Sequence, residues 1–262
     1  MTRVVSPATR HLNRARGMAW LIVMGLSPVV ASPAWAGRPL TTEDTGTLDP
    51  GKAELELSVD YLRDGGAQSL VVPGGPVLNL GLTAGLEGTV ATSFLLFEPQ
   101  GKPLRAGLGD SLIRLKYRFL DETARRPALM AAVSARLPTG DEGRGLGEPG
   151  VDIQTLAVVS KTAGRVTLTL NTGYTFVIRN RDLDVANVNA SVEGAITRAW
   201  ALVGEVVSEL ATSRRTEDRA VLRMGMVHAV TERLRLDTAV GFGTTRASPD
   251  VLFTIGVTIN LN

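Results

Sequence analysis

The chain of 262 residues contains no cysteine, and it shows neither a large excess of one charge nor a long apolar run after residue 36. Without thiols we expect no disulfide, no thiolate metal site and no cysteine nucleophile. The 28 Lys and Arg residues face 26 Asp and Glu residues, which gives no electrostatic argument for binding nucleic acid. No stretch after residue 36 reaches the roughly 18 consecutive apolar residues of a transmembrane helix candidate.

The first 36 residues predict a secretory signal peptide. Four arginines and no acid precede the apolar run 18–31, and Ala34-Trp35-Ala36 has the small residues of a cleavage site. The run is shorter than the roughly 20 residues that span a bilayer as a helix. Cleavage after Ala36 would remove four of the 28 basic residues and leave 24 against 26 acidic ones. We then expect a periplasmic N-terminal segment, residues 37–51, and one domain, residues 52–262.

Beyond Gly51, twelve segments alternate between apolar and polar residues with a period of two, as the successive side chains of a β-strand do. Their short connections lie near 84–87, 120–127, 161–164, 195–198 and 231–232, and the long polar ones at 64–76, 98–108, 138–150, 179–184, 211–218 and 244–250. Short turns at one rim, long loops at the other and an even strand number are typical of outer-membrane barrels. We predict an all-β fold, a single closed antiparallel transmembrane β-barrel of about 12 strands in an up-and-down meander.

Aromatic residues are few, and their positions favour a membrane barrel over a soluble β-sandwich. Membrane barrels carry aromatic girdles at both lipid interfaces, whereas soluble proteins gather aromatics in a core. In the predicted topology every aromatic after residue 36 falls near a strand end, although Phe97 needs a bulge or a strand end to join the apolar row. The predicted girdles comprise Tyr61, Phe94, Phe97, Tyr117, Phe119, Tyr174, Phe176, Trp200, Phe242 and Phe253.

The row opposite the apolar one would face the lumen, and it carries charges of both signs in blocks. Each Arg or Lys facing lipid at mid-bilayer would cost about 2–4 kcal/mol, so we place these residues inside. Two interpretations stay open: a polar pore whose charges guide solutes, and a web of ion pairs that fills a barrel of intermediate width. The candidate lumen residues are Glu54, Glu56, Arg114, Lys116, Glu205, Arg219, Arg223, Arg233 and Arg235.

Signals for catalysis or metal binding are weak. His228 is the sole histidine after residue 36, and no serine or orienting acid stands beside it as a hydrolase would need. Asp141, Glu142 and Glu148 could bind calcium, or simply belong to a glycine-rich surface loop. Residues 41–44 look like a helix-capping signal, yet no amphipathic helix follows. We predict no enzyme, no catalytic residue, no metal and no cofactor.

Four segments together resemble a family of proteobacterial outer-membrane transporters named for the meta-pathway of phenol degradation. They are 38–45 (RPLTTEDT), 107–110 (GLGD), 115–119 (LKYRF) and 137–141 (LPTGD). With the hairpin rhythm, the similarity covers essentially the whole chain after the signal. The resemblance implies a β-barrel in the outer membrane and import of aromatic or other poorly permeant carbon sources.

We therefore expect a passive channel or transporter for small solutes in the outer membrane of a Gram-negative cell. Its expected partners are outer-membrane lipid, the barrel-assembly machinery and a small solute, with no nucleic acid. A second hypothesis is a closed structural or surface-recognition barrel, with a lumen plugged by paired charges or by residues 37–51. A third is an outer-membrane lipid hydrolase that uses His228.

Overall fold

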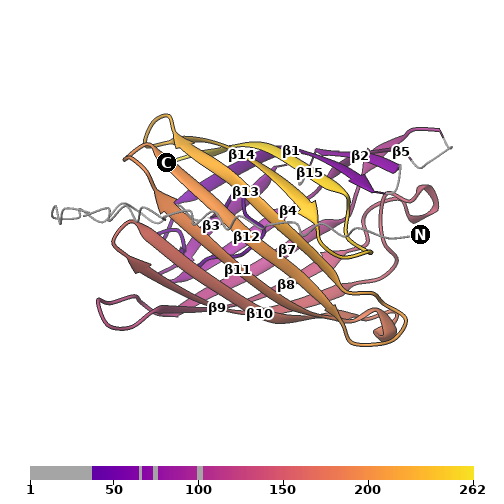
Figure 1. Ribbon diagram of the computed structural model, residues 1–262, viewed down its shortest axis with the longest axis horizontal. Coiled ribbons are helices and arrows are strands. Elements are labelled where there is room, and N and C mark those ends of the chain that lie inside the picture. The colour runs from indigo at the N-terminus through magenta and orange to yellow at the C-terminus, as the bar shows by residue number, and fades with distance from the viewer. Residues whose placement is uncertain (1–36, 65–66, 73–75, 99–102) are drawn as a thin grey trace, which may run out of the picture. The chain divides into compact units, whose positions relative to one another are not determined.

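The computed structural model describes residues 37–64, 67–72, 76–98 and 103–262, and in these ranges the chain forms one continuous β-sheet (Figure 1). The predicted signal peptide, residues 1–36, lies outside the described residues. No helix long and apolar enough to cross a membrane occurs in the described ranges. The strands are β1 (Ala53–Asp64), β2 (Ala67–Val72), β3 (Val77–Thr83), β4 (Leu86–Ala91), β5 (Phe94–Glu98), β6 (Arg105–Leu108), β7 (Ser111–Leu120), β8 (Ala128–Leu137), β9 (Asp152–Ala163), β10 (Val166–Val177), β11 (Val185–Ala195), β12 (Trp200–Ala211), β13 (Arg219–Ala229), β14 (Leu234–Gly243) and β15 (Val251–Asn260).

Twelve of these strands close into an antiparallel ring, which confirms the predicted barrel. Neighbours pair in the order β1, β3, β4 and β7 to β15, and β15 returns to β1 with Glu54 opposite Asn260 and Arg63 opposite Val251. A closed ring has no unpaired strand edge, and a bilayer tolerates only such a ring or helices. Figure 1 shows the ring strands inclined to the long axis, as barrel closure requires.

On the side of the long loops three ring strands are interrupted and continued by short strands. Two of these, β2 and β6, lie in the stretches 64–76 and 98–108 that were predicted as long loops, so those two predictions are corrected. β3 pairs with the first part of β1 and β2 with its last part, and β5 continues β4 beyond Thr92 and Ser93. β6 precedes β7 across Gly109 and Asp110. The sequence pattern did not predict these interruptions. Phe97, which did not fit the apolar row of an unbroken strand, lies in β5 beyond the second interruption.

The ring has an apolar outer surface and a polar interior. In β10, Leu168 and Leu170 are 58% and 49% exposed, whereas Thr169 and Asn171 are 7% and 0% exposed. Large apolar side chains exposed on strand after strand suit hydrocarbon and would be a liability in water. Predicted girdle residues exposed on the outer surface are Phe94, Tyr117, Phe119, Trp200, Phe242 and Phe253, while Tyr61, Phe97, Tyr174 and Phe176 are half-buried.

Two of the sequence motifs meet at the rim with the long loops. Asp110, from the GLGD segment, accepts hydrogen bonds from the backbone N–H groups of Gly140 (3.0 Å) and Glu148 (2.9 Å) and from the guanidinium of Arg136. Arg136 in turn bonds Asp152 at 2.6 Å. Residues 138–151, which include the short helix η1 (Glu142–Arg144), are therefore fastened to the barrel wall by one carboxylate.

The same loop is packed through a glycine of the first motif. Leu146 is 1% exposed, and a Cβ added to Gly107 would lie only 2.8 Å from its side chain. Any other residue at 107 would displace Leu146. The next long connection contains a second short helix, η2 (Arg181–Leu183), held where Tyr174 donates a hydrogen bond to Asp184 at 3.1 Å.

Candidate functional site

Residues 37–51, which we call the plug segment, lie inside the ring rather than beyond its rim. The segment bonds to Asp237 of β14, Glu205 of β12, Asn171 of β10 and Lys116 of β7, strands from different sides of the barrel. It can reach all of them only from within the lumen. Of the two predictions for residues 37–51, a periplasmic segment and a segment that plugs the lumen, these contacts fit the second.

Glu205 binds the turn of the plug segment. Its carboxylate accepts hydrogen bonds from the backbone N–H groups of Thr41 (2.9 Å) and Thr42 (2.7 Å) and from the Thr42 hydroxyl (2.7 Å). Glu205 is 3% and Thr42 3% exposed. Hydrogen bonds to an ionised acceptor are stronger than neutral ones, and they satisfy a charge that would be costly to bury alone. One lumen acid thus holds the turn by its main chain.

Glu43 makes the strongest ionic contact of the plug segment with the wall. Its carboxylate bonds to the Arg114 guanidinium and, at 2.7 Å, to Lys116 Nζ. Burial by itself raises the pKa of Glu43, but Lys116 and Arg114 outweigh burial and lower the pKa to about 2. The backbone of Glu43 also exchanges two hydrogen bonds with the Asn171 amide, at 2.8 and 2.7 Å. At neutral pH Glu43 is ionised and clamped between β7 and β10.

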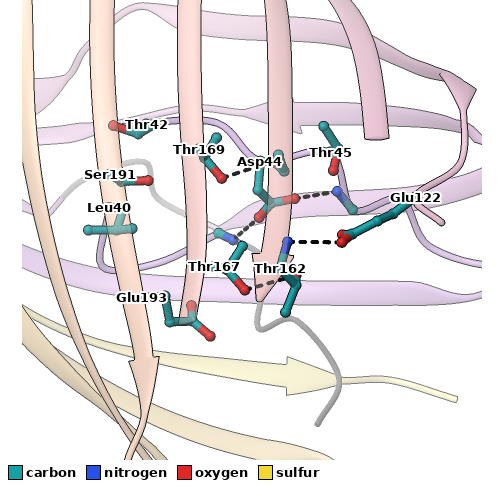
Figure 2. A pocket seen from close by; sticks show the side chains of 13 residues that line it. Leu40, Thr42, Asp44, Thr45, Glu122, Thr162, Thr167, Thr169, Ser191 and Glu193 are labelled. Carbon is teal, nitrogen blue, oxygen red and sulfur yellow. Dashed lines mark hydrogen bonds between the residues drawn. The ribbon is translucent and has the colours of Figure 1, made fainter. Parts of the chain in front are cut away.

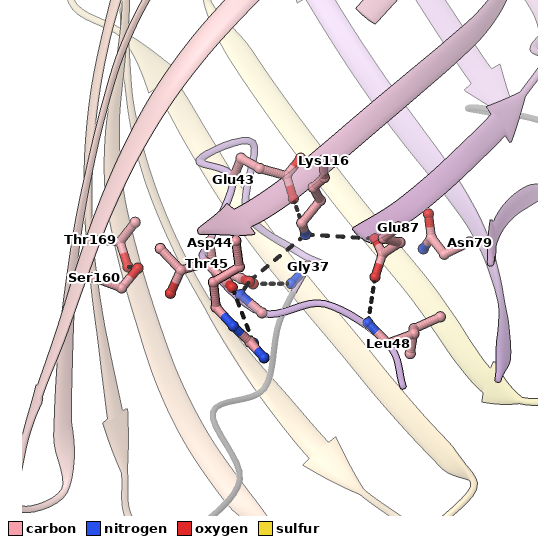
Figure 3. Close-up of polar contacts among 12 residues, drawn as sticks. Gly37, Glu43, Asp44, Thr45, Leu48, Asn79, Glu87, Lys116, Ser160 and Thr169 are labelled. Carbon is pink, nitrogen blue, oxygen red and sulfur yellow. Dashed lines mark hydrogen bonds and ion pairs between the residues drawn. The ribbon is translucent and has the colours of Figure 1, made fainter. Parts of the chain in front are cut away.

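Lys116 is shared by three carboxylates (Figure 3). Its Nζ lies 2.7 Å from Glu43, 3.7 Å from Glu87 and 3.9 Å from Asp44. Glu87 also accepts a 2.8 Å hydrogen bond from the Leu48 N–H, so it holds the descending part of the plug segment. The described part of this cluster holds more acidic than basic groups.

The first residues of the plug segment are bound on the opposite wall. Arg38 donates to Asp237 at 3.3 Å and to the Thr254 hydroxyl at 2.7 Å. Arg223 donates to the Pro39 carbonyl at 3.0 Å and lies 3.5 Å from Glu205. Contacts on both sides of the lumen thus hold a single turn of chain across it.

The remaining candidate lumen residues have other surroundings. Arg235 bonds to Glu54 at 2.7 Å, and Glu56 accepts a 2.9 Å hydrogen bond from Asn79. Arg219 is exposed at the start of β13, opposite Glu209. Arg233 is exposed in the turn before β14. Four candidates touch the plug segment directly: Arg114, Lys116, Glu205 and Arg223. Glu56 lies near Gly37, where an added Cβ would be 3.2 Å from its Oε1.

A small cavity remains beside the plug segment (Figure 2). Hydroxyl groups from β9, β10 and β11 line one side, among them Ser160, Thr169 and Ser191, and Asp44 lies on the other side. Its volume of about 50 Å³ has room for a few water molecules, since one water occupies at least about 10–15 Å³ in this measure. An organic solute does not fit in this cavity.

The residues considered for catalysis and for calcium binding make contacts of other kinds. His228 stacks on Trp200 with ring centroids 4.0 Å apart, and its Nδ1 lies 3.2 Å from the Ala199 carbonyl. Two of the acids considered as calcium ligands have other contacts: Asp141 caps η1, and Glu142 lies 3.6 Å from Arg179. Among the described residues, no group of three or more His, Cys, Asp or Glu is arranged to hold a metal ion.

Sequence reasoning missed the wall residues that bind the plug segment without forming part of a charged block. Asn171 and Asp237 are 0% and 5% exposed, and both contact residues more than a hundred positions away. The one available signal was the RPLTTEDT segment: its acids face a strand with three basic residues on its inner row. The helix-capping interpretation of residues 41–44 left these acids without partners.

The family model described as "Putative MetA-pathway of phenol degradation" matches residues 36–261. No curated protein matches the sequence.

Among solved structures, the fold is similar to the crystal structure of the COG4313 outer membrane channel from Pseudomonas putida F1, with a TM-score of 0.66 and 15% identity over 83% of this chain and 98% of that one. It is also similar to the KdgM porin in complex with disordered oligogalacturonate (TM-score 0.56, 8% identity, 80% and 99% covered). The NanC porin matches with a TM-score of 0.55 and 10% identity over 79% of this chain and 100% of that one. At such identities the likeness concerns the fold.

Proposed function

This chain belongs to the family of the phenol-degradation pathway, whose model matches residues 36–261, and from this we propose its function. We propose that the protein is an outer-membrane channel for small solutes and that the plug segment closes it. The solute crosses when residues 37–51 leave the lumen or shift within it. The proposed location is the outer membrane of a Gram-negative cell, reached after removal of residues 1–36 and insertion by the barrel-assembly machinery.

The observation that carries this proposal is the polar character of the contacts between plug segment and wall. Glu205 and Asn171 bind main-chain groups, while Lys116 and Asp237 bind charged side chains. When such contacts open in a lumen that water can enter, water replaces them, so a contact to a charged group costs about 1.5–3 kcal/mol net. An apolar core would instead expose hydrocarbon surface at about 25 cal/mol per Å². The plug segment is thus built to be displaced without unfolding the ring.

The size of the remaining cavity supports a channel that must open over one that stays open. About 50 Å³ admits a few waters but no organic molecule. We infer that a solute passes when the plug segment moves, because the segment contacts several sides of the lumen wall. Once it has moved, the exposed lumen presents Arg114, Lys116 and Arg223 with Glu205 and Asp237, a mixed set of charges that can orient a polar or partly polar solute.

The solute class rests on the family description alone. That description points to the breakdown of phenol, so aromatic or other poorly permeant carbon sources are the proposed cargo. The KdgM structure holds oligogalacturonate, an acidic sugar chain, in a barrel of similar fold. An uptake assay should therefore include aromatic compounds and oligogalacturonate.

A closed structural or surface-recognition barrel remains the second candidate, because the lumen is occupied. In that case the plug segment is a permanent filling, and its removal opens a hole that the protein never uses. The two candidates differ in whether the full chain passes any solute.

Planar-bilayer recording tests the proposal. The full chain and a variant in which Ala36 is joined to Gly51 are compared under the same salt and voltage. We expect brief, small openings from the full chain and a large, steady conductance from the variant. Exchange of Arg223 and Arg235 for Glu in the variant background should shift its ion selectivity toward cations. A full chain that stays silent at every voltage and in the presence of aromatic acids or oligogalacturonate, beside a conducting variant, would favour the closed barrel.

A further inference from the structure

The first described residue of the plug segment ends up beside a carboxylate. The backbone nitrogen of Gly37 lies 2.8 Å from Asp44 Oδ2 (Figure 3). The segment turns back at residues 41–43, which brings positions 37 and 44 together inside the lumen. Gly37 is also the residue that follows the predicted cleavage site.

Asp44 lacks a strong cationic partner among the described residues. Its nearest base is Lys116, 3.9 Å away, which lies closer to Glu43 and Glu87. Burial raises the pKa of Asp44; Lys116 opposes this effect and Glu43 adds to it. The remaining contacts of the carboxylate are backbone N–H groups, those of Gly37 and of Gly46 (2.5 Å). A further positive charge at this place would stabilise the ionised form.

A second carboxylate reaches the same place from the wall. A Cβ added to Gly37 would lie 3.2 Å from Oε1 of Glu56, a residue of β1. The Gly37 position is therefore flanked by Asp44 from the plug segment and by Glu56 from the barrel. Among the described residues around it, Arg38 forms an ion pair with Asp237, and Lys116 lies closer to Glu43 and Glu87 than to Asp44.

We propose that cleavage of the Ala36–Gly37 peptide bond converts the Gly37 nitrogen into an ammonium group that forms a buried ion pair with Asp44 and thereby fastens the plug segment. In the hydrolysis, water adds its hydroxyl to the Ala36 carbonyl carbon, the C–N bond breaks, and the Gly37 nitrogen takes the proton. A free α-amine is protonated below its usual pKa of roughly 7.7, so the new terminus carries a positive charge. The inference rests on export with cleavage after Ala36, and it makes processing the step that completes the closed state.

The new positive charge would compensate the negative charge of Asp44 and Glu56 at the site. In the uncleaved chain the Gly37 nitrogen is a neutral amide, which can donate one hydrogen bond to Asp44 but brings no charge. After cleavage it is an ammonium with three donors, enough for Asp44 and for Glu56. The position also suits a glycine as the first residue, because a Cβ there would lie 3.2 Å from Oε1 of Glu56, which leaves little room for a side chain.

Chemical labelling of the terminal amine tests the proposal without reference to transport. The exported and processed protein, folded in detergent micelles, is treated at pH 7.5 with an amine-acylating reagent, and acylation of the Gly37 nitrogen is followed over time by mass spectrometry. An ion pair raises the pKa of the amine and hides it, so we expect labelling about tenfold or more slower than in the unfolded chain.

Two variants assign the protection to Asp44. Asp44→Asn removes the partner charge and should bring labelling to within a few-fold of the unfolded rate. Asp49→Asn makes the same change at an exposed aspartate of the plug segment and should leave protection intact. Equal labelling rates in the wild type and Asp44→Asn would overturn the proposal, and so would a processed chain that begins at a residue other than Gly37.

A third variant separates the charge from the residue. One alanine inserted between Ala36 and Gly37, with cleavage verified to leave that alanine first, moves the ammonium one residue away while Gly37 keeps an amide. Its terminal amine should be labelled as fast as in the unfolded chain. Persistent protection of this displaced amine would show that burial alone, and not the Asp44 pairing, protects the terminus. Because none of these rates depends on solute passage, they test the terminus even if the channel proposal fails.

Discussion

At the scale of single residues, the lumen is organised around carboxylates whose partners come from far along the chain. Glu205 binds main-chain N–H groups 163 and 164 positions earlier, and Asp237 binds Arg38, 199 positions away. Buried charges of this kind persist only when they are paired, and removal of one partner leaves a costly orphan. Their loss should therefore act on the docking of the plug segment before it acts on the ring.

Glu205→Gln is expected to loosen the plug segment. The amide oxygen can still accept a hydrogen bond, but the charge that strengthens the contacts with Thr41 and Thr42 is lost. A loss of about 1.4 kcal/mol would raise the open fraction about tenfold. The measurement is the open probability of single channels in planar bilayers.

Glu209→Gln serves as the matched control, because Glu209 lies on the same inner row of β12, two inward-facing positions further along the strand. It should leave the open probability within about twofold of the wild type. If both variants open equally, Glu205 does not hold the closed state.

Acidification should open the channel through Glu43. The docked residue has a pKa of about 2, whereas a free glutamate titrates near about 4.3. A lowered pKa contributes docking free energy above the free value, and this contribution is lost as the pH falls toward 2. Asp44, whose pKa burial raises, acts in the opposite direction and reduces the net effect. We expect conductance to rise on the order of tenfold between pH 5 and pH 2.5.

Glu43→Gln removes the titrating group, so this variant should conduct more at pH 5 and respond less to acid. A wild-type conductance that stays flat or falls over this range, in protein that remains folded by its mobility on unboiled gels, contradicts the role of Glu43.

At the scale of elements, the two loop motifs act as one fastening. Asp110 sits between β6 and β7, where the strand is interrupted, and its carboxylate binds the N–H groups of Gly140 and Glu148. The interruption frees this side chain from the alternation of the strand and points it at the loop. The short sequences GLGD and LPTGD thus describe the two halves of a single contact.

Asp110→Asn is expected to release residues 138–151 while the ring stays closed. The amide can accept only through one oxygen, so at least one loop N–H and the Arg136 pairing are weakened. Limited proteolysis of the protein in liposomes should cut this loop several-fold faster. Asp121→Asn, at an exposed aspartate of the opposite rim, should leave the cutting rate unchanged. Equal rates in both variants would mean that packing of Leu146 alone holds the loop.

The sequence predicted the strands well and the plug segment poorly, and the reason is physical. Alternation is a local property, so it revealed twelve strands, their order and the rows that face outward and inward. Interruptions such as that at Gly109 and Asp110 resume the alternation after a shift and leave no local sign. The docking of Glu43 on Asn171 depends on how the ring closes in space, which no local pattern contains.

At the scale of the whole molecule, different parts of the chain form the stable ring and block its lumen. The ring closes through ten residue pairs between β1 and β15, none of which involves the plug segment. The apolar outer surface suits contact with lipid, and the polar inner surface suits contact with water or with residues 37–51. A change on one surface should therefore leave the other intact.

Leu170→Arg tests the outer surface. Leu170 is 49% exposed on the outer row of β10, away from the strand ends. An arginine there should cost about 2–4 kcal/mol of the free energy of unfolding in lipid vesicles, whereas Val230→Arg, in a turn at the rim, should cost at most about 1 kcal/mol. Urea titration in the same lipid provides both values. Similar costs at the two positions would mean that the outer row does not face hydrocarbon.

The wall grips the plug largely by its peptide backbone: Glu205 holds two main-chain amides, Glu87 and Asn171 hold others, and Arg223 holds a carbonyl. Backbone groups are common to all peptides, so the receptor is less tied to one stopper than a set of side-chain pockets would be. A synthetic peptide of the RPLTTEDT sequence, added from the side of the short turns, should therefore block a barrel that lacks its own plug. A peptide altered at Thr41, which gives Glu205 only its backbone N–H, should block it nearly as well, which would make the truncated barrel a scaffold for interchangeable, peptide-gated pores.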